Sequence, residues 1–367
     1  TLSPDGPENK VAEQNTIAVG YRATVSHSDN SSLETELQTL GLEGWVISGR
    51  DGQWAVSGSK GAPRGAIYGA HAFVESLLGV RFLAPNVTLS PNNGTDPSMH
   101  KSMHRVFVPP FEMRDMNNAQ SEGLGNEPWS VAVGDNGQEF GDTEKKAGGG
   151  ILYADPPGAV HTSWTLVPPS LFNNKSGHPE SFHPEWFAGG QLCWLAPGLK
   201  EHLAATVPGI LRGQPNATII SISQNDDTNY CKTGADQVVS LEEGSPAAPM
   251  LRAVNFVADA IREEFPNVAI DTLAYQYTRP APNKTKPRDN VIVRLCSIEC
   301  NFLKPLTDDS NAAFTRDIVN WNKISDRLYI WDYVVDFHAW LMPWPNYYVL
   351  APNIRFFASH GVKGIFE

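Results

Sequence analysis

The feature that most constrains the fold is a repeated order of strand, loop and helix that begins near residue 104. We predict strands at the short apolar segments 111–114, 131–133, 162–166, 218–223, 269–275, 291–295, 328–331 and 364–366. After the fourth, apolar residues at helical spacing follow Ser245, which can cap a helix. Eight strands alternating with helices over about 260 residues predict an α/β fold, a (β/α)8 TIM barrel. Residues 115–160 fit least, because they are rich in glycine and show little helical period.

Residues 1–103 show the pattern of a small α+β domain. We predict in order a strand at 16–21, a hairpin at 44–58, a helix at 63–79 and a strand at 80–85. Proline at the start of that helix and glycine at its end fit their usual positions. A segment rich in proline and asparagine then forms a linker. The predicted domains are therefore 1–103 and 104–367, and we expect the barrel to be truncated after its eighth strand.

Polar and aromatic side chains follow the predicted strands. A TIM barrel places its chemistry at the carboxyl ends of its strands, so residues there are candidates for one shared pocket. They are Arg114, His161, Gln224, Asn225, Asp226, Tyr275, Glu299, Trp331, Asp332 and Glu367. Amides and carboxylates bind hydroxyl groups, and aromatic rings cover the apolar faces of sugars. The set therefore predicts a carbohydrate partner, an oligosaccharide or polysaccharide.

Cleavage of a glycosidic bond needs two carboxyl groups on opposite sides of the bond, one of them protonated. We predict Asp226 as the acid, because the neighbouring Asp227 can raise its pKa. Glu299 is predicted as base or nucleophile, with Glu367 and Asp332 as alternatives. Arg114, His161, Tyr275 and Trp331 would position the sugar, with Gln224 and Asn225 beside them. The spacing in the sequence leaves retaining and inverting mechanisms open.

Several of these residues also have a structural interpretation. An Asp after a strand commonly caps a helix or forms a turn, which applies to Asp226. Glu299 lies between two cysteines and could belong to a disulfide loop. Asp332 could pair with Arg355, and Arg114 could be an ion-pair partner. Only their joint placement at one sheet edge favours catalysis.

Charge and motifs exclude several classes of partner. The formal net charge is −12, which argues against nucleic acid as a partner and against an anionic membrane surface. No apolar segment approaches the length of a membrane span. His161, His178 and His183 match no standard metal spacing. We therefore expect no cofactor and no metal.

Sequons and cysteines indicate an extracellular protein. The pattern Asn-x-Ser/Thr occurs at Asn30, Asn86, Asn93, Asn174, Asn216 and Asn283. Six matches favour a secreted glycoprotein, although a chain rich in asparagine can produce them by chance. Four cysteines permit two disulfides by three pairings. We predict Cys193 with Cys231 and Cys296 with Cys300.

The segments "HTSWTLVPPSLF", "SISQNDDTNYC", "IDTLAYQYTRPAP", "DNVIVRLCSIECNF", "RLYIWDYVVDF" and "APNIRFFASHGVKGIFE" are familiar. Over residues 104–367 the chain resembles the glycoside-hydrolase-like domain-of-unknown-function family 4838 (DUF4838), which is related to α-glucuronidase and β-hexosaminidase barrels. The segment "PRGAIYGAHAFVESLLGVRFLAP" resembles the small domain that precedes the barrel in those hydrolases.

The resemblance implies a barrel with a hydrolase-like pocket, and the family's motif covers Gln224, Asn225, Asp226, Glu299, Trp331, Asp332 and Glu367. Arg114 matches the place of a sugar-binding arginine in hexosaminidases. The chain departs from hexosaminidases after the fourth strand. Hexosaminidases have an Asp–Glu pair there, with the Glu as the general acid, and this chain has Asp226–Asp227. This departure puts substrate-assisted chemistry in doubt.

Two functions therefore compete. The first is a secreted glycoside hydrolase that acts on a polysaccharide or glycan. The second is a non-catalytic extracellular glycoprotein on the same scaffold, either carbohydrate-binding or forming an assembly, because a fold does not imply an activity. Another enzyme class on the barrel, such as a lyase, is a third alternative.

Overall fold

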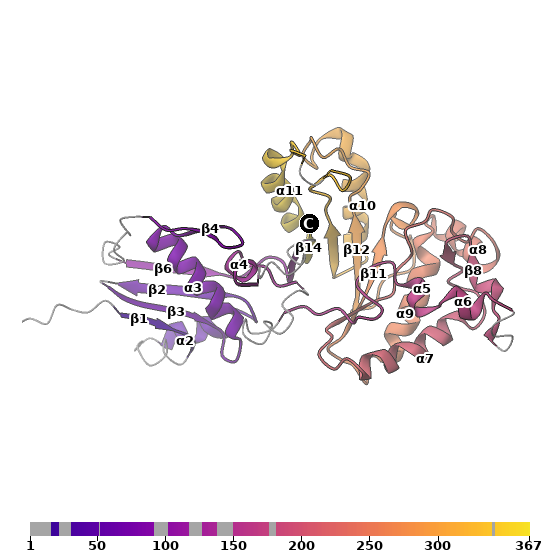
Figure 1. The fold of residues 1–367 in the computed structure, drawn as a ribbon, viewed down its shortest axis with the longest axis horizontal. Coiled ribbons are helices and arrows are strands. Elements are labelled where there is room, and N and C mark those ends of the chain that lie inside the picture. The colour runs from indigo at the N-terminus through magenta and orange to yellow at the C-terminus, as the bar shows by residue number, and fades with distance from the viewer. Residues whose placement is uncertain are drawn as a thin grey trace, which may run out of the picture. The chain divides into compact units, whose positions relative to one another are not determined.

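The computed structural model describes residues 16–21, 31–50, 52–91, 102–116, 127–137, 150–175, 181–339 and 342–367. The chain divides into two compact units. The first comprises residues 1–110 and 118–150, and the second comprises 111–117 and 151–367. Figure 1 shows the two units in different parts of the colour range.

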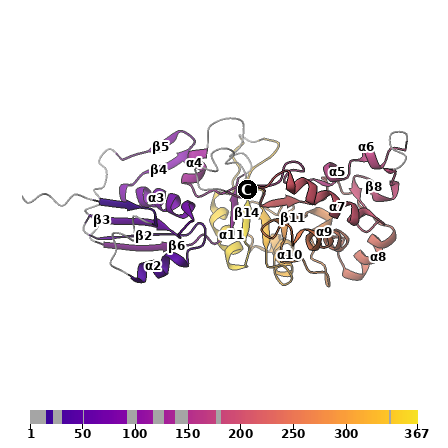
Figure 2. The same cartoon turned by 90° about the horizontal axis from the view of Figure 1, so that it is seen from below.

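The first unit is built on a four-stranded sheet with a helix on each face. The strand order is β1 (Thr16–Val19), β3 (Gln53–Gly58), β2 (Trp45–Arg50) and β6 (Ser102–Phe107). Alternation along β2 points Trp45 and Ile47 to the core under α3 (Pro63–Leu78), and Val46 to the core under α2 (Ser31–Gln38). Figure 2 shows these two helices on opposite sides of the sheet.

The strands and helix predicted for this unit are present, but its extent differs. The predicted boundary after residue 103 falls inside β6, which pairs with β2 in antiparallel register. The segment that we predicted to be a linker also contains a strand, β5 (Val87–Leu89), which pairs with β4 (Arg81–Ala84). Residues predicted as the second barrel strand form the end of α4 (Glu127–Ala132) instead. Val131 of α4 packs into the core of this unit, so the apolar segment there is a helix face.

The second unit contains a six-stranded parallel sheet, which fits a TIM-like fold. Its order is β10 (Ile219–Ser221), β11 (Ala269–Ala274), β12 (Val291–Cys296), β13 (Leu328–Trp331), β14 (Gly364–Phe366) and β7 (Met113–Asp115). These are the predicted strands four to eight, followed by the first. Within the described residues the sheet does not close into a full barrel, because β7 and β10 remain at its edges.

The third predicted strand was also placed wrongly. Residues Ser163–Leu166 form the short helix α5, and the place beside β10 is taken by Tyr153, which bridges to Ile219. Pro156 and Pro157 follow shortly after and have no N–H to donate, so a longer strand cannot form there. Thr162 instead joins the sheet through its side chain, which donates to the carbonyl of Ser221.

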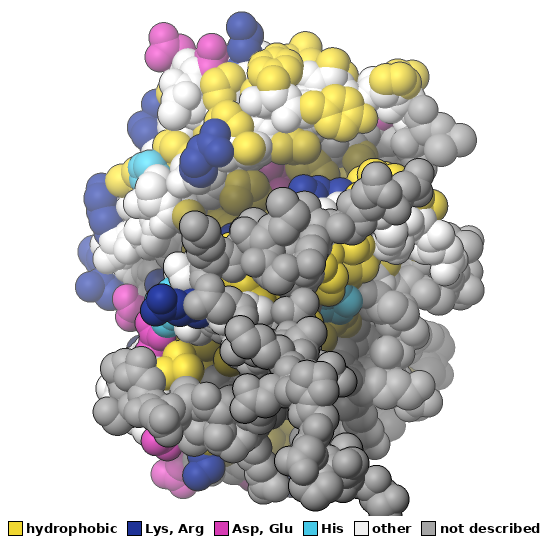
Figure 3. Space-filling model, turned by 90° about the vertical axis from the view of Figure 1, so that its left-hand side faces the viewer, with side chains coloured by type: hydrophobic (Ala, Val, Ile, Leu, Met, Phe, Trp, Pro, Cys, Tyr) yellow, Lys and Arg dark blue, Asp and Glu magenta, His cyan; other side chains and the backbone are white. Residues whose placement is uncertain are grey.

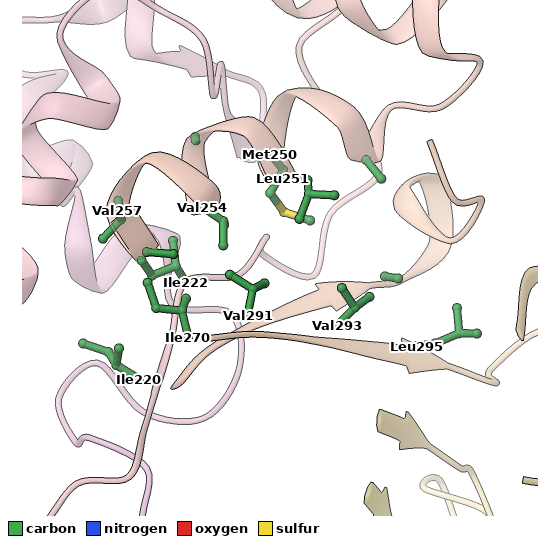
Figure 4. Packing of buried hydrophobic residues seen from close by; sticks show 14 of the residues in the cluster. Ile220, Ile222, Met250, Leu251, Val254, Val257, Ile270, Val291, Val293 and Leu295 are labelled. Atoms are coloured by element: carbon green, nitrogen blue, oxygen red, sulfur yellow. The ribbon is translucent and has the colours of Figure 1, made fainter. Parts of the chain in front are cut away.

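Helices cover one face of this sheet, which we call the outer face. They are α7 (Leu199–Arg212), α9 (Ala247–Ile261), α10 (Ala312–Asn322) and α11 (Tyr347–Ser359), while α8 (Gly234–Glu243) packs against α9. Figure 4 shows Val254 of α9 pointing toward Ile270 and Val291 of the strands. The N-cap of α9 is Pro246, one residue after the predicted Ser245, whose hydroxyl accepts from the backbone N–H of Ala247. Burial of these apolar side chains is the main stabilising term of the unit.

The opposite, inner face has a second apolar cluster and a polar one. Met113, Tyr153, Ile219, Ile292, Tyr329 and Phe366 form the apolar cluster. Gly364 is required here, because a Cβ atom would come within 2.7 Å of the Tyr329 ring. The polar cluster is described with the site.

Short elements complete the second unit. They are α6 (Pro169–Phe172), β8 (Phe187–Ala188), β9 (Gln191–Leu192) and the 3-10 turns Pro184–Trp186, Gln276–Thr278 and Asp309–Asn311. A disulfide joins Cys193 to Cys231, as predicted. Cys296 and Cys300 are free thiols, so the second predicted disulfide is not formed. In the described parts of the chain, no helix is long and apolar enough to span a membrane.

Candidate active site

The site lies at the carboxyl edge of the parallel sheet, above a buried ion pair on the inner face. Asp271 and Arg294 occupy neighbouring strands, and Arg294 Nη2 lies 2.7 Å from Asp271 Oδ1, both side chains being almost fully buried. The hydroxyl of Tyr153 donates to Asp271, and so does that of Ser221. The Arg294 guanidinium also lies 5.6 Å from the centre of the Trp331 ring. These contacts make a rigid polar floor beneath the sheet edge.

The sequence predictions missed this floor. Asp271 stands alone among apolar residues in "AIDTLA", and Arg294 does the same in "VIVRLC". A single charge inside an apolar strand has to be paired when the strand is buried. Alternation places both side chains on the same face of adjacent strands, and this signal could have identified the pair.

Asp226 lies beyond the end of β10, and its side chain is exposed. The hydroxyl of Tyr275, which follows β11, donates to Asp226 Oδ1 at 3.0 Å. Gln276 in turn donates to the Tyr275 hydroxyl at 2.9 Å. Burial, and then the bond to Asp226, raise the pKa of Tyr275, so its proton stays in place. The carboxylate is therefore held at the rim by a fixed donor while one side faces solvent.

Gln224 and Asn225 have structural contacts. The amide of Gln224 donates to the Tyr275 carbonyl, and its oxygen accepts from Thr278. Asn225 donates to the carbonyl of Gly190 at 2.9 Å. Both side chains are buried. They shape the turn that presents Asp226.

Asp332 and Glu367 follow β13 and β14 at the same edge. Asp332 is buried and accepts from the Ser297 hydroxyl at 2.6 Å. Burial raises the pKa of Asp332, opposed by the hydrogen bonds from Ser297 and from the Tyr333 backbone. In the described part of the chain, no hydrogen bond or ion pair engages the Glu367 side chain. Burial, and then the charge of Asp332, raise the pKa of Glu367 to about 7.

Tyr333 links the two groups of carboxylates. Its ring stacks on Trp331 with centroids 5.8 Å apart. Burial raises the pKa of Tyr333, and the nearby charges of Asp226 and Glu299 add to the effect. The backbone N–H of Tyr333 donates to the same Ser297 hydroxyl that binds Asp332. The charge of Asp226 thus acts on Tyr333, the residue that follows Asp332, and the charge of Asp332 acts on Glu367.

Two other predicted site residues lie in different surroundings. Glu299 is exposed and pairs with Arg279 at 3.0 Å. Arg279 also pairs with Asp317 at 2.7 Å, so Glu299 belongs to a surface ion-pair network. Arg114 donates to the Phe111 carbonyl and alternates with Met113, which faces inward, so its side chain leaves on the outer side.

His161 remains near the site. Its Nδ1 lies 2.9 Å from the Gln224 carbonyl oxygen, and its ring lies 6.1 Å from that of Tyr275. Trp331 lines the inner face next to Phe366, and its indole N–H has no acceptor among the described residues. Across those residues, no three His, Cys, Asp or Glu side chains gather as a metal site would require.

Comparison with known proteins gives a family match and structural similarities. The profile of the family described as Domain of unknown function (DUF4838) matches residues 82–367. No curated protein matches the sequence.

Three solved structures illustrate the structural similarities. A family 89 glycoside hydrolase from Clostridium perfringens shares 10% identity over 90% of this chain and 43% of its own, with a TM-score of 0.45. A GH20 exo-β-N-acetylglucosaminidase from Vibrio harveyi is 10% identical in sequence, with a TM-score of 0.44. The match covers 88% of this chain and 58% of that protein. Endo-glycoceramidase II from Rhodococcus sp. is 11% identical in sequence, with a TM-score of 0.32. The match covers 47% of this chain and 42% of that protein. The chain spans less than two thirds of each structure, so the function is argued from its own residues.

Proposed function

The chain belongs to the DUF4838 family, and we propose that it is a secreted glycoside hydrolase that cleaves a glycosidic bond in a glycan with two carboxyl groups. The observation on which this rests is the contrast between Glu367 and Asp226. Glu367 is half-buried, has no partner among the described residues and has a pKa raised to about 7. Asp226 is exposed and held by a tyrosine hydroxyl. Two carboxyls in such different environments suit an acid and a base.

In this proposal Glu367 is the general acid. At neutral pH a substantial fraction of its side chains hold a proton, which can pass to the leaving oxygen of the scissile bond. Asp332 supports this state, because its charge disfavours ionisation of Glu367. The role predicted for Asp226 as acid therefore moves to Glu367. Glu299 is not assigned, because Arg279 already holds it at the surface.

Asp226 is the second carboxylate, acting as base or nucleophile. In a closed TIM barrel the ends of the fourth and eighth strands would face each other across the opening, and the proposed cleavage needs Asp226 and Glu367 in that arrangement. The Tyr275 hydroxyl orients one oxygen of Asp226 and leaves the other available. Trp331 and Tyr333, which stack on each other at the same edge of the sheet, would offer ring faces to a sugar. His161, beside Tyr275, would contact the same ring.

Secretion rests on separate observations. The disulfide between Cys193 and Cys231 suits an oxidising compartment. Asn86, Asn174, Asn216 and Asn283 are exposed, as glycan attachment requires, while Asn30 and Asn93 lie outside the described residues.

The test is a glycan-substrate screen with wild type and three matched variants. Glu367→Gln and Asp226→Asn are expected to lose about 10²- to 10⁴-fold in kcat/KM, since each removes one proton-transfer or nucleophilic group. Glu299→Gln is the control and should retain wild-type turnover. Unchanged turnover in Glu367→Gln would refute the acid role. Binding of glycans without turnover by the wild type would instead favour the non-catalytic alternative.

A further inference from the structure

A row of aromatic rings extends from the candidate site to the protein surface. Tyr333, which stacks on Trp331, has its ring centre 6.5 Å from that of Phe302. Phe302 lies 6.1 Å from Trp344. Successive ring contacts therefore connect the inner face of the sheet to the loop that precedes α11.

Two exposed tyrosines follow Trp344 in the chain. Tyr347 and Tyr348 begin α11 and are 78% and 64% exposed. The Tyr348 hydroxyl donates to the carbonyl of Leu303, which follows Phe302 in the chain. Figure 3 shows hydrophobic side chains gathered toward the top of the visible face. We call Phe302, Trp344, Tyr347 and Tyr348 the tyrosine platform.

The polar surroundings of the platform also suit a sugar. Asn301, Lys304 and Asn346 line a small cavity together with Phe302, Tyr333 and Asp332. Aromatic rings cover the C–H faces of sugar rings, and amide and ammonium groups bind hydroxyl groups. Large exposed aromatic side chains grouped together commonly mark a binding surface. Continuity with the carboxylates favours a ligand long enough to reach both places.

We propose that the tyrosine platform binds additional sugar rings of a neutral polysaccharide whose scissile bond lies at Asp226 and Glu367. This rests on the proposed hydrolase function and adds the substrate class, a polymer with several rings bound beyond the cleaved bond. The polymer is neutral because the net charge of −12 repels polyanions.

Binding to soluble polysaccharides in native affinity gels tests this without requiring turnover. The probes are a neutral β-glucan, a neutral mannan, a neutral xylan and the polyanion polygalacturonate, each with Glu367→Gln to prevent degradation. We expect retardation by at least one neutral probe and none by polygalacturonate. Tyr347→Ala/Tyr348→Ala in the same background should bind that probe about tenfold more weakly, or about 1.4 kcal/mol.

Leu241→Ala is the matched control, since Leu241 of α8 is 77% exposed and lies outside the platform. It should leave retardation unchanged, and thermal melting should confirm that all variants fold. Retardation equal in the tyrosine variant and its parent would overturn the proposal. So would the absence of retardation by every neutral probe, or a dimer in sedimentation velocity that the tyrosine variant dissociates without a change in sugar binding. Binding by a wild type that hydrolyses nothing would refute the hydrolase function alone and leave this inference standing.

Discussion

The two faces of the parallel sheet differ in what they bury. The outer face presents Ile270, Val291 and Val293 to α9, and the cluster there consists of apolar residues. The inner face buries Asp271 and Arg294, and Asp332 and Glu367 follow its strands at the carboxyl edge of the sheet. Alternation along each strand thus separates apolar packing from the charged groups.

The comparison has a consequence for stability and activity. Apolar burial on the outer face stabilises the fold, while buried charge on the inner face is tolerated at a cost. Changes to the outer face should therefore alter stability with little effect on catalysis. Changes at the inner rim should alter catalysis and, for Glu367, even increase stability.

The largest effect is expected for Arg294→Met. Removal of the guanidinium leaves Asp271 buried without its counter-ion, which should lower the free energy of unfolding by about 3 to 5 kcal/mol. Urea denaturation followed by tryptophan fluorescence measures this. The control is Arg294→Met/Asp271→Leu, which removes both charges and should recover most of the loss. A single variant as stable as wild type would show that the inner face does not depend on the pair.

Ile270→Ala tests the outer face. It removes buried apolar volume between β11 and the α9 side, and we expect a loss of about 2 to 5 kcal/mol in unfolding free energy. Ile270→Val should cost only about 0.5 to 1.5 kcal/mol. Both should keep kcat/KM near that of wild type at a temperature where they are folded. Lost activity in a fully folded Ile270→Val protein would contradict the separation of the faces.

Glu367→Gln should stabilise the protein in a pH-dependent manner. Between pH 4.5 and about 7 the folded protein keeps a proton that the unfolded chain releases, so wild-type stability falls as pH rises through this window. The total loss in the free energy of unfolding of the wild type is about 3 kcal/mol, and it is complete above the pKa of Glu367 in the folded protein. The variant should match wild type below pH 4.5 and exceed it above 7 in thermal melts. Equal melting temperatures at pH 8 would show that Glu367 is not held in a desolvated site.

Tyr275→Phe should have the smallest effect. It removes one hydrogen bond to Asp226, worth about 1 kcal/mol, so we expect a several-fold loss in kcat/KM with little change in melting temperature. Steady-state kinetics on the best substrate measures it. A loss as large as that of Asp226→Asn would mean that the hydroxyl takes part in the chemistry itself.

Strongly apolar segments made much of the fold predictable. Strands four to eight combine a short apolar segment with flanking turn residues, and the structure has β10 to β14 there. The segments around Val131 and Thr162 were too short for any period to separate strand from helix. Val131 packs as part of a helix, and Thr162 makes a side-chain bond to the Ser221 carbonyl. Such tertiary contacts are invisible in the sequence.

The rule that chemistry follows strand ends selected Asp226, Tyr275, Asp332 and Glu367, which follow strands of one sheet, and their role in catalysis stays a prediction. It did not reveal that Glu299 pairs with Arg279, because the partner comes from another loop. Nor could it rank the acids, since burial and hydrogen bonds decide the pKa of each.

The most direct test of the central claim is the pH dependence of kcat/KM for wild type and Asp332→Asn on the best substrate from the screen. If Glu367 is the acid, wild-type kcat/KM falls with rising pH along a limb with an apparent pKa of about 7. In Asp332→Asn the limb shifts to lower pH, because the charge that raises the pKa of Glu367 is gone. A rate that does not fall between about pH 6 and 8, or a limb that stays in place in the variant, would contradict the account.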